Sequence, residues 1–158
     1  MRPLVLLVIF PWVFGSSFPQ TTNRPMSLSI SASERVFKIG TEVKIKATLV
    51  NLSDHVITLN DRIRACDYPV EVRDEKGSLV TGTPYKQQLR CTPSGLLEES
   101  RNMLVTLKPQ ESREEEIVVT GLFELRLPGT YSIQVWRKVP KELGGAIQSN
   151  VLTITMTQ

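Results

Sequence analysis

Apolar and polar residues alternate along most of this chain. In the clearest stretch, 128–136, Tyr131, Ile133 and Val135 fall on one side and polar residues on the other. Successive side chains of a β-strand point to opposite faces, so a period of two predicts a strand with one buried face. The stretch 42–51 repeats the pattern, with lysines on its polar side. Both stretches therefore predict half-buried strands.

Shorter stretches of the same kind are separated by turn residues. They predict further strands at 27–31, 56–59, 69–73, 103–107, 117–119 and 150–157, a hairpin turn at 74–77 and irregular segments at 60–67, 82–102, 120–125 and 138–149. No long amphipathic helical pattern interrupts them. Many short strands with regular turns favour an all-β fold, an Ig-like antiparallel β-sandwich of about seven to nine strands. A closed barrel is the alternative, and the unequal loops favour the sandwich.

Tyr131 follows Pro128-Gly129 at the start of a late strand. In Ig-like sandwiches a tyrosine in such a place pins a neighbouring connection through its hydroxyl, an arrangement called the tyrosine corner. An ordinary buried tyrosine is the alternative. The position predicts that the Tyr131 hydroxyl bonds to the backbone just upstream.

The first 17 residues have the form of a secretory signal peptide. Arg2 precedes an apolar run from Leu4 to Phe14, and small residues follow at Gly15 to Ser17. This run is shorter than the roughly 20 residues that cross a membrane, although an uncleaved anchor is the alternative. We expect a signal peptide at 1–17, a flexible lead-in at 18–26 and one domain at 27–158. The mature chain is then secreted or periplasmic, without a stable membrane span.

Two cysteines, Cys66 and Cys91, follow the predicted signal. An even number of cysteines in an oxidising compartment predicts a disulfide. Two free thiols, or a metal pair without further ligands, are the alternatives. Such a bond closes a loop of about 25 residues and stabilises the fold by roughly 3 kcal/mol in the chain-entropy model.

Charge and motifs argue against several functions. The net charge of +3 is spread along the chain, which is unlike the basic face of a nucleic-acid binder. No cysteine and histidine spacing of a zinc site is present, and His55 is the single histidine. Glu98-Glu99 and Glu114 to Glu116 could supply paired carboxylates for glycoside hydrolysis. We interpret Glu114 and Glu116 as a charged strand edge instead, and expect neither enzymatic activity nor a cofactor.

Four segments carry a resemblance to a known family: Asn51-Leu52-Ser53 after a strand, and the stretches 70–77, 107–112 and 128–135. With the region between 50 and 139, they resemble bacterial BsuPI-type proteinase inhibitors and related Ig-like envelope domains. The resemblance implies a β-sandwich without enzymatic activity and a bacterial source. It supplies no inhibitory residue, because no reactive-loop motif matches.

The sequence thus indicates an exported, monomeric, non-enzymatic module that binds a protein or cell-envelope partner through its loops. A secreted proteinase inhibitor with a disulfide-pinned loop at 85–97 is the alternative. Candidate partner contacts are Tyr85, Leu89 and Trp136, the last because it lies off the inward side of its strand. Asn51 begins an N-glycosylation sequon, which matters only in a eukaryotic secretory pathway and also arises by chance.

Overall fold

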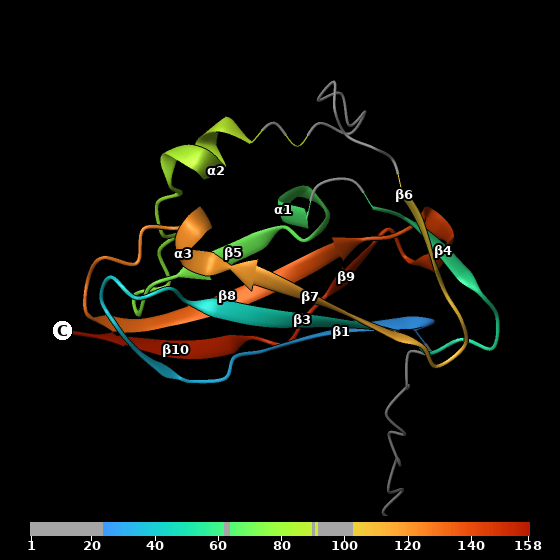
Figure 1. Ribbon diagram of the computed structural model, residues 1–158, viewed down its shortest axis with the longest axis horizontal. Coiled ribbons are helices and arrows are strands. Elements are labelled where there is room, and N and C mark those ends of the chain that lie inside the picture. The colour runs from blue at the N-terminus through green and yellow to red at the C-terminus, as the bar shows by residue number, and fades with distance from the viewer. Residues whose placement is uncertain (1–23, 62–63, 90, 92–102) are drawn as a thin grey trace, which may run out of the picture.

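The structure, a computed structural model, describes residues 24–61, 64–89, 91 and 103–158 (Figure 1). Within these residues it forms a β-sandwich of ten strands. The strands are β1 Met26–Ser31, β2 Val36–Lys38, β3 Lys44–Asn51, β4 Ile57–Asp61, β5 Val70–Arg73, β6 Met103–Leu107, β7 Ser112–Val118, β8 Gly129–Lys138, β9 Ala146–Gln148 and β10 Leu152–Thr157. The helices are α1 Arg64–Asp67, α2 Pro84–Gln88 and α3 Val119–Leu122, with a 3₁₀ turn at Lys141–Leu143.

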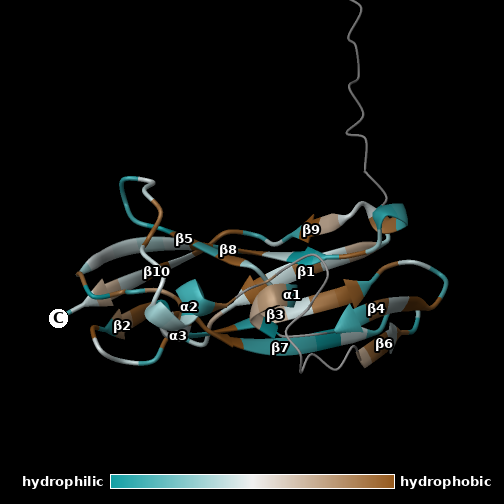
Figure 2. Cartoon of the chain, turned by 90° about the horizontal axis from the view of Figure 1, so that it is seen from above, coloured by the Kyte–Doolittle hydropathy of each residue, from teal (hydrophilic) through white to brown (hydrophobic). Residues whose placement is uncertain are grey.

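Two layers face each other across the core. One layer contains the strands in the order β1-β3-β7, and the other contains β2-β10-β8-β5 with β9 paired to β8. A two-stranded sheet, β4-β6, lies at one end of the molecule (Figure 2). All strand pairs are antiparallel except β2 with β10. The helices α1, α2 and α3 gather along one long edge, the upper edge of Figure 1.

The alternating strands bury the faces that the sequence predicts. Tyr131, Ile133 and Val135 of β8 are at most 6% exposed, and the apolar side of β3 is as fully buried. The sequence prediction of an Ig-like β-sandwich is therefore confirmed. It missed β9, which lies inside the predicted loop 138–149 and pairs with the end of β8.

The segment 82–102 is not wholly irregular, because it contains α2. The Thr83 hydroxyl accepts a hydrogen bond from the Lys86 amide, and Pro84 occupies the first helical turn. A threonine cap followed by proline is a common helix start, since it satisfies one free amide and fixes one backbone angle in advance. A second short helix, α1, lies in the segment 60–67. Residues 92–102 lie outside the described part.

The tyrosine corner is present. The Tyr131 hydroxyl donates a hydrogen bond of 2.9 Å to the carbonyl oxygen of Leu127, four residues upstream. The ring is buried, so this bond is shielded from water and fixes the connection into β8 against the core.

We expect Tyr131→Phe to lower the free energy of unfolding by about 1 kcal/mol, because one buried hydrogen bond is lost while the ring keeps its packing. Urea denaturation measures the change. Tyr85→Phe is the matched control, because the Tyr85 side chain is exposed and should leave stability unchanged. Equal effects of the two variants would contradict a stabilising corner.

Candidate functional site

A buried arginine lies at the centre of the most highly charged region of the interior. Arg137 occupies the next inward position of β8 after Val135 and is 1% exposed. Its Nη2 donates hydrogen bonds of 2.9 Å to the Asn60 carbonyl oxygen and to Asp61 Oδ1. The sequence analysis did not single out Arg137, although the period of two that places Tyr131 inward also places Arg137 inward.

The charges continue from Arg137 toward the surface. Asp61 also accepts from Arg113 of β7, whose Nη2 lies 2.8 Å from Glu115 Oε1. Glu115 in turn pairs with Arg64 of α1, with its Oε2 2.9 Å from Arg64 Nε. Burial lowers the pKa of Arg113, but its hydrogen bond to Glu115 and the charge of Asp61 outweigh this and raise it overall. We call Arg137, Asp61, Arg113, Glu115, Arg64 and Asp67 the ion network.

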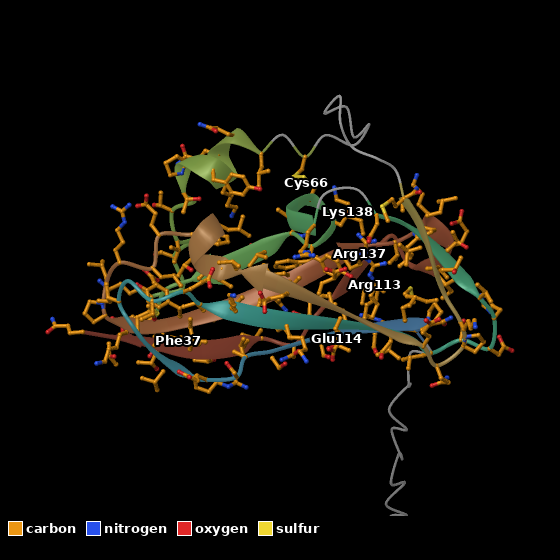
Figure 3. All side chains as sticks on the ribbon, viewed as in Figure 1. Phe37, Cys66, Arg113, Glu114, Arg137 and Lys138 are labelled. Atoms are coloured by element: carbon orange, nitrogen blue, oxygen red, sulfur yellow. A yellow bond between two sulfur atoms is a disulfide. The ribbon has the colours of Figure 1, made fainter. Side chains whose placement is uncertain are left out.

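The helix α1 covers this network and carries Cys66 of the disulfide (Figure 3). Asp67 Oδ1 lies 3.3 Å from Arg137 Nη1, and the Tyr68 ring centroid lies 4.9 Å from the Arg137 guanidinium carbon. Burial raises the pKa of Tyr68. Cys66 and Cys91 form the predicted disulfide and tie α1 to the chain that leaves α2. The bond thus anchors the element that covers Arg137.

An open hollow of about 380 Å³ lies between α2 and the edge of β5. Leu79, Lys86, Phe123 and Trp136 line it, with Glu71 on the outer face of β5. The Lys86 ammonium lies 3.4 Å from the centroid of the Phe123 ring, a cation–π contact. Burial lowers the pKa of Lys86, while the charge of Glu71 opposes the shift. The hollow therefore offers an apolar floor between one cation and one carboxylate.

The three predicted contact residues have different environments. Tyr85, on α2, is 56% exposed, and the half-buried Trp136 forms one wall of the hollow. Leu89 ends α2 and is partly buried against the core, so much of its side chain is taken up by internal packing. The fold brings α2 and Trp136 to the same hollow, although Lys86 and Trp136 lie 50 positions apart in the sequence.

Asn51 is fully buried, which argues against its use as a glycosylation site. Its Nδ2 donates to three carbonyl oxygens, those of His55, Leu107 and Lys108, at 2.8, 3.0 and 3.1 Å. Its Oδ1 accepts from the amide and hydroxyl of Ser53. A glycan on Nδ2 would displace these bonds, so the predicted modification does not fit the fold. The side chain instead joins two neighbouring turns.

We expect Asn51→Ala to lower the free energy of unfolding by about 2 kcal/mol, because buried carbonyl groups lose their donor. Ser53→Ala, which removes a single hydroxyl from the same turn, is the milder control. Thermal and urea denaturation measure both. The wild-type chain made in a eukaryotic host should also have its unmodified mass at Asn51, and a glycan on the folded protein would contradict this assignment.

Glu114, Glu116 and the histidine are surface groups. Glu114 and Glu116 share the outer face of β7, as expected, and form ion pairs of 3.0 and 3.4 Å with Lys46 and Lys44 of β3. His55 is exposed beside Asp54. Glu98 and Glu99 lie outside the described residues. In the described part of the chain, no group of three or more His, Cys, Asp or Glu residues could hold a metal ion.

Among the described residues, no helix has the length and apolar character needed to cross a membrane. No protein-family model and no curated protein matches this sequence. The comparison with known proteins therefore rests on solved structures.

Three solved structures illustrate the similarity. The CARDB domain of the PF1109 protein from Pyrococcus furiosus is 13% identical, with 84% of this chain and 87% of that chain covered and a TM-score of 0.43. The C-terminal domain of wzt is 12% identical over 85% and 74%, with a TM-score of 0.47. A beta-glucosidase from Listeria innocua is 15% identical over 83% of this chain but 16% of its own, with a TM-score of 0.43. These are likenesses of fold, and no function is taken from them.

Proposed function

We propose that this chain is an exported β-sandwich module that binds a protein partner at the hollow beside α2. One observation carries the proposal: Leu79, which lines a hollow walled by Trp136, exposes 63% of its surface, and Tyr85, which precedes the lining residue Lys86 on α2, exposes 56%. Exposed apolar and aromatic side chains around a concave surface are typical of partner contacts, where a few such residues supply most of the binding energy.

The surroundings of the hollow support this role. The chain that leaves α2 is held by the disulfide to α1, and α1 is held by the ion network to both layers. A surface that is already ordered loses less conformational entropy when a partner binds. Lys86 and Glu71 could pair with opposite charges of the partner and fix its orientation.

Export is part of the same proposal. The expected signal peptide at 1–17 and lead-in residues 18–23 lie outside the described residues. Met26, expected to end the lead-in at 18–26, is instead the first residue of β1 and is buried, so the sandwich begins one residue before the expected domain at 27–158. The Cys66–Cys91 disulfide is consistent with an oxidising compartment, so we place the module outside the cell or in the periplasm. A bacterial origin and kinship with BsuPI-type inhibitors remain proposals.

The proteinase-inhibitor alternative places its reactive loop at 85–97. The first four residues of this loop, Tyr85 to Gln88, lie in the helix α2. Substrate-like inhibitors present an extended strand to the protease, since main-chain pairing needs extended backbone. The helical part of this loop thus favours contact through the hollow. Residues 92–97 lie outside the described part.

Affinity capture from the native secretome or envelope tests the proposal, with the oxidised wild-type domain as bait. The double variant Leu79→Ser/Tyr85→Ser removes the two exposed contacts. The control Leu127→Ser/Val151→Ser removes two side chains that are 70% and 56% exposed elsewhere. We expect partner recovery to fall roughly tenfold or more with the first variant and to stay unchanged with the control.

Undiminished recovery with Leu79→Ser/Tyr85→Ser would contradict binding at the hollow. Recovery of an active protease that cleaves or is inhibited by the 85–97 segment, independently of Leu79, would favour the inhibitor alternative instead. Both baits must show the same thermal stability, so that unfolding does not explain a loss.

A further inference from the structure

Among the described residues, the strand β6 has one unpaired edge, at the rim of the sandwich. It pairs with β4 on one side, and no described residue forms a backbone hydrogen bond to its other side. Figure 2 shows β6 as the outermost strand at its end of the molecule. A free edge offers unpaired amides and carbonyls to another strand.

The register identifies which backbone groups face outward. Leu104 lies opposite Asn60, and the Asn60 carbonyl is bonded to Arg137. Because strand carbonyls point within the plane of the sheet, the bond to Arg137 indicates that this carbonyl is turned away from β6, and we infer that the pair does not exchange backbone hydrogen bonds. Alternation along the ladder gives Thr106 the same orientation. Leu104 and Thr106 therefore direct their amides and carbonyls to the free edge.

A second contact agrees with this pattern. The Lys108 amide donates a hydrogen bond of 2.6 Å to Glu111 Oε2. This amide is therefore turned away from β4 and does not bond to its backbone. The bonded pairs of β4 and β6 are then those at Leu107, Val105 and Met103.

This edge lacks the usual protection against pairing. The sequence of β6 is Met-Leu-Val-Thr-Leu, with no charge and no proline. Met103 and Leu104 are 59% and 71% exposed. The edge strand β7 instead carries Arg113 and three consecutive glutamates, which disfavour strand addition.

We propose that the free edge of β6 pairs antiparallel with β6 of a second copy of this chain, joining two β4-β6 sheets into one. A two-fold axis at Val105 sets Leu104 against the second copy's Thr106, so the outward amides and carbonyls satisfy each other reciprocally. Met103 then lies opposite the second copy's Leu107, which extends one apolar face. Because β6 has no charged residue, this register brings no like charges together within the strand.

The dimer replaces the monomer expected from the sequence. One pair of short strands buries less surface than a stable dimer needs, so association is weak and depends on concentration. The edge lies at the opposite end of the long axis from α2 (Figure 1), so pairing leaves the hollow open in both copies.

Sedimentation equilibrium of the oxidised chain across a range of concentrations tests the proposal. We expect a reversible monomer–dimer equilibrium that Leu104→Lys weakens roughly tenfold or more, because the two lysines are then diagonal neighbours on the same face across the axis. Leu127→Lys is the matched control, since Leu127 is 70% exposed and lies away from β6. Wild-type chain that stays monomeric throughout, or a dimer equally weakened by both variants, would overturn the proposal.

Cross-linking checks the register. Val105 lies opposite Val105 of the second copy, in a pair without backbone hydrogen bonds. The Cα separation of such a pair suits a disulfide. Val105→Cys should give a covalent dimer under mild oxidation, whereas Lys138→Cys, which lies on β8 and not on the edge of β6, should not. A Val105→Cys chain that dissociates fully under denaturing, non-reducing conditions would overturn the proposed pairing.

Discussion

Arg137→Met is expected to lower the free energy of unfolding by about 3 kcal/mol, because it removes the buried cation that pairs with Asp61 and Asp67. Methionine keeps much of the apolar stem, so the loss reports on charge rather than on a cavity. Asp61 keeps Arg113 as a partner, whereas Asp67 loses the ion pair that α1 makes to β8. The segment around α1 should therefore be the first to loosen.

Urea denaturation of Arg137→Met, followed by intrinsic fluorescence, measures this loss. Arg126→Met is the control, because Arg126 is exposed and its single ion pair to Glu124 spans 3.4 Å. Exposed pairs of this kind contribute at most about 1 kcal/mol. A loss below that value for Arg137→Met would show that the network does not stabilise the fold.

Removing the disulfide should have an effect of similar size. The double variant Cys66→Ser/Cys91→Ser opens a loop of 25 residues, for which chain entropy gives about 3 kcal/mol. Beyond the loss in global stability, the segment around α1 should loosen, because α1 supplies Arg64 and Asp67 to the ion network. Comparison of oxidised and reduced wild-type chain provides an independent measurement of the same quantity.

The two effects should also be coupled. Once the disulfide is removed, α1 holds Arg137 less firmly. Arg137→Met should then lower the free energy of unfolding by less than it does in the oxidised chain. A double-mutant cycle measures this difference, since residues in one network are not additive. Additive losses would mean that the disulfide and the network stabilise the fold independently.

The strand faces could be predicted because local alternation determines them. Tyr131 is the clearest case, since the turn before it and the period of two after it predict both its burial and its hydrogen bond. Arg137 follows from the same period. An arginine at an inward position is discounted in sequence reasoning, because a buried charge needs partners that the local pattern does not reveal. The helix α2 could also have been predicted from its Thr83-Pro84 start.

The network and the true role of Asn51 could not be predicted, because both depend on contacts between distant strands. Asp61 and Arg137 are brought together by the packing of β4 on β8, and nothing near either residue in the sequence specifies that contact. Asn51 matches a sequon that is read over three residues, whereas its burial depends on Leu107 and Lys108. A local motif shows which modification a residue type could accept, whereas the fold determines whether the side chain is exposed to it.

Backbone hydrogen exchange of the oxidised domain, alone and bound to its captured partner, tests partner binding at the hollow most directly. Protection on binding should concentrate in residues 78–88, which contain Leu79 and α2, while the charged outer face of β3 and β7 should exchange as in the free domain. Protection confined to β3 and β7, with 78–88 unchanged, would contradict the hollow as the binding site.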